Sequence, residues 1–223
     1  MRGRRLRIPH VWPEPEGATV IFFDKWLDLA RRLSRFAARC GGAMILASAL
    51  LVGGDVITRK LLALSVGGSD EISGYAFAIA TSWGLAFTLL ERANVRVDAL
   101  YGHLPRPVTA ILDLVALLAL GLFVGLLTWF AGMVLQDSLL FSTRATTPLA
   151  TPLWIPQGLW LAGFALFLFA WVPLVVRVAL ALVAGDLALL RRLAGARTLE
   201  EDAADEAAHA KKLQSAVIDG GAR

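Results

Sequence analysis

Four long apolar runs without a charged residue divide this chain, and most of its charge lies between them. The clearest run covers residues 72–90. At about 1.5 Å per residue, a helix of this length spans roughly 28 Å, close to the ~30 Å hydrocarbon core of a bilayer. Two later runs, 114–136 and 148–176, are longer still. Each of these three runs therefore predicts a transmembrane helix.

The first run, residues 40–54, is shorter than a bilayer core requires. It reaches a full span only if Val56 and Ile57 are included and if Arg39 extends its charge back toward the surface. With that extension, the pattern predicts an all-α membrane protein whose transmembrane domain covers residues 40–176. Its four transmembrane helices are expected at about 40–57, 72–90, 113–136 and 153–176.

A helical pattern of a different kind precedes the first run. Over residues 24–39 apolar side chains recur on one face, and the charged ones fall opposite. This predicts a separate amphipathic helix lying in the cytoplasmic membrane interface, although a helix packed on a partner protein would show the same pattern. The apolar residues of this pattern are Trp26, Leu29, Ala30, Leu33, Phe36 and Ala37, and the opposite face holds Asp28, Arg31, Arg32, Arg35 and Arg39.

The two ends of the chain are polar. Residues 1–23 are basic and rich in proline, so we expect an unstructured tail. A cleaved signal peptide is disfavoured, because nine basic residues in the first 39 precede the apolar run, far more than a signal's short charged region holds. Residues 177–223 are expected to form a cytoplasmic tail that is partly helical, since Thr198 and Glu201 have capping-box spacing.

The distribution of positive charge predicts the orientation. Of the 22 Lys and Arg residues, 19 lie in the N-terminal segment, the middle loop and the C-terminal segment, and three lie in the other two loops. The positive-inside rule then places both termini in the cytoplasm. The net charge of +4 is explained by this bias, so it is no argument for a nucleic-acid partner. The composition agrees with the membrane class, since 57% of residues are apolar and 18% charged.

Little in the sequence points to catalysis or to a bound cofactor. The three histidines, His10, His103 and His209, lie outside the apolar runs, so they are not placed to hold a haem within the bundle. Cys40 has no second cysteine to pair with, and no cluster of His, Cys, Asp and Glu has metal-ligand spacing. We therefore expect neither an enzyme, nor a metal, nor a cofactor.

Small residues recur along two of the expected helices, at spacings that let helix backbones approach closely in a membrane. These faces can pack on each other or on another protein, and the sequence leaves both possibilities open. The positions are Gly74, Ala78, Ser82 and Ala86 in one helix, and Gly121, Gly125, Thr128 and Gly132 in the next.

Two polar clusters flank the second expected helix. Before it, Ser69 is placed to cap the helix, and Asp70 and Glu71 fall in its first turn, where the helix dipole favours acids. After it, residues 91–98 read Glu-Arg-Ala-Asn-Val-Arg-Val-Asp, a mixed-charge loop on the cytoplasmic side. Capping and solvation explain each cluster when it is taken alone.

Taken in order, these features resemble the small membrane subunit of tripartite ATP-independent periplasmic (TRAP) transporters. The resemblance covers about residues 40–176 and rests on the order of its motifs, none of which is specific alone. They are Asp55-Val56-Ile57-Thr58-Arg59, Ser69-Asp70-Glu71, Glu91, Val95-Arg96-Val97-Asp98, Thr147-Pro148 and Trp154-Ile155-Pro156.

The resemblance implies a scaffold in the bacterial inner membrane for sodium-driven uptake of an organic anion, often a carboxylate. A periplasmic binding protein would deliver the substrate, and a large membrane subunit would hold the substrate and sodium sites. By position, Arg59, Asp70 and Glu71 are candidates for the periplasmic end or the binding protein, and Glu91, Arg96 and Asp98 for contact with the large subunit. An autonomous small carrier or channel, and a membrane assembly protein unconnected with transport, remain as alternatives.

Overall fold

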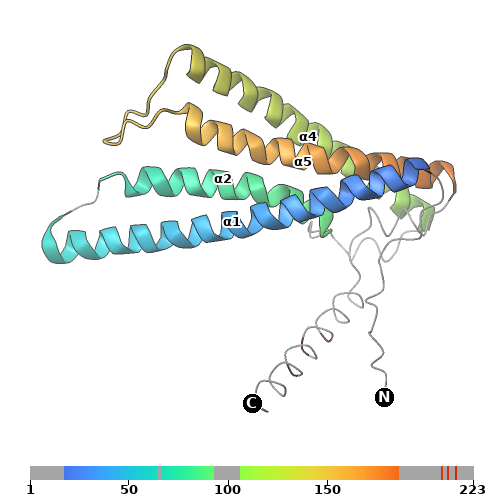
Figure 1. Cartoon of the computed structure of the whole chain (residues 1–223), viewed down its shortest axis with the longest axis horizontal. Coiled ribbons are helices and arrows are strands. Elements are labelled where there is room, and N and C mark those ends of the chain that lie inside the picture. The colour runs from blue at the N-terminus through green and yellow to red at the C-terminus, as the bar shows by residue number, and fades with distance from the viewer. Residues whose placement is uncertain are drawn as a thin grey trace.

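The computed structural model describes residues 18–64, 67–92 and 106–185, together with the single positions 207, 210 and 214. These residues form four long helices and one isolated β-bridge. The helices are α1 (Ala18–Leu62), α2 (Ser69–Leu90), α4 (Arg106–Leu140) and α5 (Trp154–Val183), as labelled in Figure 1. Each is long and apolar enough to cross a membrane, in agreement with the four transmembrane helices expected from the sequence.

The expected separate amphipathic helix is absent from the described chain, because residues 24–39 are the first part of α1. This helix contains no proline, and it continues through Gly41–Gly42 and Gly53–Gly54 to Leu62. At about 1.5 Å per residue its 45 residues reach roughly 67 Å, twice the thickness of a hydrocarbon core. Because the helix is continuous, residues 24–39 follow the axis of the rest of α1 and do not form a helix of their own.

The other helices also extend past the uncharged runs. The α4 helix begins at Arg106, with Pro107 in its first turn, where a missing N–H is tolerated. The α5 helix continues through Pro173 and Arg177 to Val183, so residues 177–183 belong to this helix rather than to the expected tail. An uncharged run shows which residues can lie in the hydrocarbon core of a bilayer. A helix can extend beyond that run, because its backbone hydrogen bonds do not depend on whether the side chains are charged. In the expected tails, residues 1–17 and, apart from positions 207, 210 and 214, residues 186–223 lie outside the described residues.

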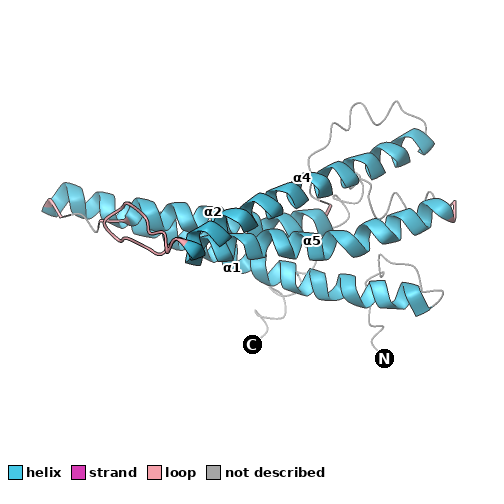
Figure 2. Ribbon diagram, turned by 90° about the horizontal axis from the view of Figure 1, so that it is seen from above, coloured by secondary structure: helices cyan, strands magenta, loops and turns pink. Residues whose placement is uncertain are grey.

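Among the described helices, α1, α2 and α5 all pack on one another, whereas α4 packs mainly on α5. Figures 1 and 2 show the four helices running roughly along one direction. The α4 helix is inclined to α5: the two diverge toward the loop that joins them in Figure 1, and toward the start of α4 in Figure 2. The buried core is built mainly by α5 and the helices that it contacts. It contains Leu27, Ala30, Ala86, Leu89, Leu117, Val124, Ala131, Phe164, Phe167, Ala170, Leu174, Val178 and Ala181.

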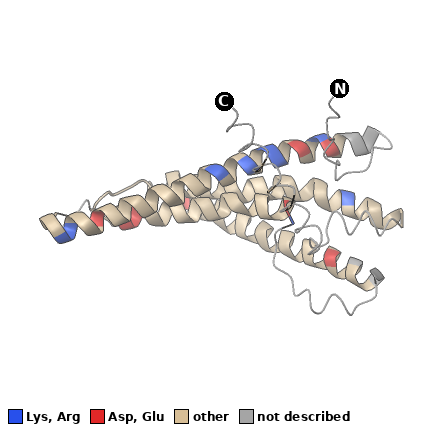
Figure 3. Cartoon of the chain, turned by 90° about the horizontal axis from the view of Figure 1, so that it is seen from below, with Lys and Arg blue, Asp and Glu red and all other residues tan. Residues whose placement is uncertain are grey.

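The charged residues of the bundle gather at its two ends, which we call the distal end and the terminal end. At the distal end, α1 ends, α2 begins and residues 141–153 join α4 to α5. At the terminal end, α1 begins, α5 ends and α2 stops at Leu90. Figure 3 shows charged residues at both ends of α1 and a long stretch without charge between them. Polar side chains that could serve a function therefore have to be sought at these two ends.

Candidate functional site

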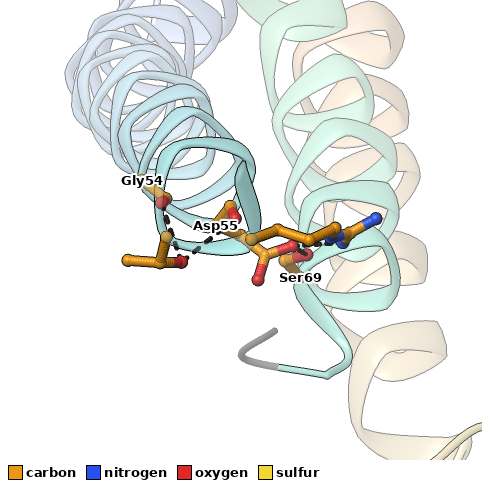
Figure 4. A network of polar contacts seen from close by, with 5 residues as sticks. Gly54, Asp55 and Ser69 are labelled. Carbon is orange, nitrogen blue, oxygen red and sulfur yellow. Dashed lines mark hydrogen bonds and ion pairs between the residues drawn. The ribbon is translucent and has the colours of Figure 1, made fainter. Parts of the chain in front are cut away.

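A buried carboxylate organises the distal end. Asp55 follows directly on the apolar part of α1, and it is only 2% exposed although it is an acid. The guanidinium of Arg59 pairs with its carboxylate, and the Ser69 hydroxyl donates a hydrogen bond to Asp55 Oδ2 at 3.0 Å (Figure 4). The Thr58 hydroxyl, in the same network, donates to the carbonyls of Gly54 and Asp55. Because a buried carboxylate is stable only when it is paired, Asp55 ties the end of α1 to the start of α2.

The expected cap at Ser69 is not formed. Ser69 is itself the first residue of α2, and the capping position belongs to Gly68, which makes no side-chain hydrogen bond. Gly68 has a φ of 93°, and a Cβ there would lie 2.5 Å from the Cδ1 atom of Leu149. Both the backbone conformation and the close approach of the loop therefore require glycine at this position. The hydroxyl of Ser69 is used for the contact with Asp55 instead.

Glu71 fastens the loop between α4 and α5 to α2. The hydroxyl of Tyr75 donates to its Oε1 at 2.8 Å, and the hydroxyl of Thr147 donates to its Oε2. The loop also has internal order, because Arg144 forms an isolated bridge with Pro152 and donates to the carbonyl of Ala150. The distal end thus holds a polar cluster in which α2 contacts α1 through Ser69 and the loop through Glu71.

Asp70 lies beside this cluster but has a different environment. It occupies the first turn of α2, as expected, and its side chain is exposed. Its backbone carbonyl accepts a hydrogen bond from the Ser73 hydroxyl. The two adjacent acids therefore differ, since Glu71 contacts other parts of the chain whereas the Asp70 side chain faces outward.

The terminal end contains an ion pair between distant parts of the chain. Arg177 on α5 is only 4% exposed, and its guanidinium pairs with the carboxylate of Asp24 on α1. The same two helices also meet at the rings of Trp26 and Phe169, whose centroids are 5.4 Å apart. These contacts hold the first part of α1 against the last part of α5.

Of the three candidates for contact with the large subunit, one lies in the part of the chain that the structure describes. Glu91 follows the end of α2 and, together with Asp28, interacts electrostatically with Arg31 on α1. The distance between Arg31 Nη1 and Asp28 Oδ1 is 3.6 Å. Arg96 and Asp98 lie outside the described residues.

Asp24 and Arg177 are structurally prominent and were not among the residues expected from the sequence. Arg177 follows the last apolar run and is easily assigned to a basic tail. One signal was available: the apolar pattern resumes after it, in residues 178–183. A lone arginine inside a continuing apolar pattern favours a buried, paired position over a solvated one.

The small-residue faces are used unevenly. A Cβ on Gly121 would lie 2.0 Å from the Trp171 ring, so α4 and α5 are closely packed at this point. Ser82 and Ala86 are buried and Ala78 is half-buried. The remaining predicted glycines have no other atom within 4 Å of where a Cβ would lie, and they are Gly74, Gly125 and Gly132. Two close approaches were not expected: Gly41 against Ala80, and Gly163 against Ser82.

Two tryptophans join α5 to its neighbours in the same way. The indole N–H of Trp171 donates to the carbonyl of Leu117 at 2.9 Å, and that of Trp83 donates to the carbonyl of Leu159 at 2.8 Å. In an α-helix each of these carbonyls also receives the N–H of the residue four positions later. That residue is glycine in both cases, Gly121 and Gly163, so the neighbouring helix can come close enough to share the carbonyl.

The hydroxyls near the middle of the helices are engaged locally. Thr81 donates to the carbonyl of Phe77, and Thr128 donates to that of Val124. Within the described part of the chain, no three His, Cys, Asp or Glu residues gather as metal ligands would. The polar chemistry of these helices thus consists of contacts that hold helices and loop together.

Comparison with known proteins assigns this bundle to a family. Residues 48–181, more than half of the 223 in the chain, match the family described as tripartite ATP-independent periplasmic transporters, DctQ component. Neither the curated proteins nor the solved structures yielded a match. The family is not enzymatic, and its tripartite organisation implies a large membrane subunit and a periplasmic binding protein as partners. The chain, a multi-pass membrane protein with four candidate spans, therefore belongs to the DctQ family, the small membrane component of TRAP transporters.

Proposed function

We propose that this subunit braces the large transport subunit of its complex during sodium-coupled uptake of an organic anion, most simply a carboxylate. The observation that supports this role is the placement of the polar side chains. The contacts made by Asp55, Glu71 and Arg177 each join two different helices or a helix and a loop, and each lies at an end of the bundle. Side chains used in this way stiffen a helical bundle, which is what a brace requires.

In this proposal the distal end faces the periplasm and the terminal end faces the cytoplasm. The strong excess of Lys and Arg in the N-terminal, middle and C-terminal segments supports this orientation. Arg59 and Glu71 would maintain the shape of the periplasmic end, and the exposed Asp70 would be available to the binding protein. Glu91, Arg96 and Asp98 would lie at the cytoplasmic edge and contact the large subunit.

Reconstitution into liposomes tests the role. The large subunit would be reconstituted with and without this chain, the binding protein added outside, and uptake of a panel of labelled carboxylates measured under an inward sodium gradient. We expect uptake only when all three proteins and the gradient are present. Uptake by this chain alone would identify an autonomous carrier, and unchanged uptake without it would remove the bracing role.

A further inference from the structure

The first part of α1 has three faces, whereas a simple amphipathic helix has two. One face is buried in the bundle and comprises Leu27, Ala30, Ser34 and Ala37. A second, which we call the apolar stripe, is exposed and comprises Phe22, Leu29, Leu33 and Phe36. A third, which we call the basic stripe, is also exposed and comprises Lys25, Arg32, Arg35 and Arg39. With 3.6 residues per turn, the apolar and basic stripes are neighbours on the helix surface.

The charge of the basic stripe is directed away from the bundle. The two acids in this part of α1 are engaged elsewhere, since Asp24 pairs with Arg177 and Asp28 with Arg31. Among the residues that the structure describes, none forms a hydrogen bond or ion pair with Arg32, Arg35 or Arg39. The stripe is exposed, so its positive charge is available to molecules outside the bundle. Figure 3 shows the Lys and Arg positions along this part of α1 in blue.

The basic stripe also lies beside apolar surface. Gly41 packs against Ala80, near the middle of α2, with 3.2 Å between a Cβ built on Gly41 and the Ala80 Cα. Arg39 and Arg35 precede Gly41 by two and six residues, which is within two helical turns. They therefore lie alongside the second half of α2, which has no charge before Glu91. Long basic side chains at such a depth extend toward the lipid phosphates.

We propose that this surface binds an anionic phospholipid, with an acyl chain along the apolar stripe and the headgroup phosphate at the basic stripe. The Asp24–Arg177 pair and the contact of Trp26 with Phe169 hold α1 on α5, so both stripes are displayed on a fixed helix. Guanidinium groups suit this role because their planar N–H donors match phosphate oxygens. The site is independent of the transport role and of the orientation proposed above.

Spin-labelled lipids test this proposal with the full-length chain in phosphatidylcholine nanodiscs. Spin-labelled phosphatidylglycerol and phosphatidylcholine would be compared by the fraction of label whose motion the protein restricts. We expect the protein to favour phosphatidylglycerol by about fivefold or more, because attraction to anionic lipid grows with each nearby basic residue. The preference should fall as salt is added. An equal restricted fraction for the two lipids would overturn the proposal without any variant.

Matched variants locate the site. Arg32→Gln with Arg35→Gln and Arg39→Gln should remove most of the preference, whereas the three Arg→Lys changes should keep most of it. Lys60→Gln with Arg144→Gln removes exposed charge at the distal end and should leave the preference unchanged. If the triple Gln variant keeps its lipid preference but no longer recovers the large membrane subunit, the stripe is a protein interface and the proposal fails.

Discussion

Trp171 and Gly121 show how a single position sets the distance between two helices in this bundle. The indole reaches the carbonyl of Leu117 only because Gly121 leaves room for the ring. Gly125, one turn further along α4, has open space where a Cβ would lie. Both glycines belong to the same small-residue pattern in the sequence, so that pattern cannot distinguish a close contact from a free position.

The two glycines should therefore respond differently to the same substitution. Gly121→Ala places a methyl group 2.0 Å from the Trp171 ring, and we expect overpacking of this kind to destabilise the protein by about 1–3 kcal/mol. Gly125→Ala meets no neighbouring atom and should be neutral or slightly stabilising, because alanine favours a helix. Thermal unfolding of both variants in detergent checks this, and equal melting temperatures would contradict it.

Asp70 and Glu71 are neighbours with different expected roles. Glu71 holds the loop at 141–153, whereas Asp70 is free to contact the binding protein. Glu71→Ala removes the acceptor of the Thr147 and Tyr75 hydroxyls, so we expect the loop at 141–153 to loosen and its hydrogen exchange to increase severalfold. Asp70→Ala should leave loop exchange unchanged, since its side chain is exposed. If Asp70 contacts the binding protein, uptake by the whole complex falls in that variant. Wild-type uptake in both variants would show that neither Asp70 nor Glu71 contributes to transport.

At the scale of elements, α1 is the unusual feature. The charged first part and the apolar second part look like two helices in the sequence, yet they form one. The first part also packs on α5 through Asp24, Trp26 and the buried face around Leu27 and Ala30. A helix of this length, held at Asp24 and at Asp55, is well suited to keep the two ends of the bundle at a fixed distance from each other.

The pairing of α1 with α5 predicts a double-mutant cycle. Asp24→Asn leaves the buried guanidinium of Arg177 without its counter-charge, and we expect a loss of about 2 kcal/mol in unfolding free energy. Adding Arg177→Gln removes the unpaired charge, so the double variant should recover part of the loss. Unfolding measurements on the two single variants and the double variant give the coupling energy. Strictly additive effects would show that the pair contributes nothing.

At the scale of the whole molecule, the bundle is built around α5. The α1, α2 and α4 helices all contact it, and α4 has little other packing among the described helices. Many large apolar side chains of α4 are exposed, among them Leu122, Phe123, Trp129 and Phe130. In a membrane protein such surface is suited to lipid or to another subunit.

The proposed orientation predicts which ends can be labelled from each side. In a background with Cys40→Ser, Thr146→Cys places a thiol in the distal loop and Lys25→Cys places one at the terminal end, both at exposed positions. A membrane-impermeant maleimide added to spheroplasts should label the first and not the second. The second should react only after the inner membrane is opened. The reverse pattern would invert the topology.

Contact with the large subunit is tested in the segment that follows α2 in the sequence. If Arg96 joins the two subunits at the cytoplasmic edge, Arg96→Glu should lower both recovery of the large subunit in mild detergent and uptake, each by severalfold. Arg96→Lys keeps the charge and should have a smaller effect. Unchanged recovery and uptake in the Arg96→Glu variant would exclude this contact.

The sequence by itself determined the fold class, the number of long apolar helices and the family, since hydrocarbon thickness sets the length of an apolar run and the family motifs follow one another along the chain. It also placed Asp70 and Glu71 in a first helical turn. Only the tertiary structure decided that α1 is continuous, that Ser69 bonds Asp55 instead of capping, and that Asp24 meets Arg177. The two side-chain contacts depend on which helix faces meet in space. Contacts between residues far apart in the chain, such as the 153 positions that separate Asp24 from Arg177, leave no periodic signal in the sequence.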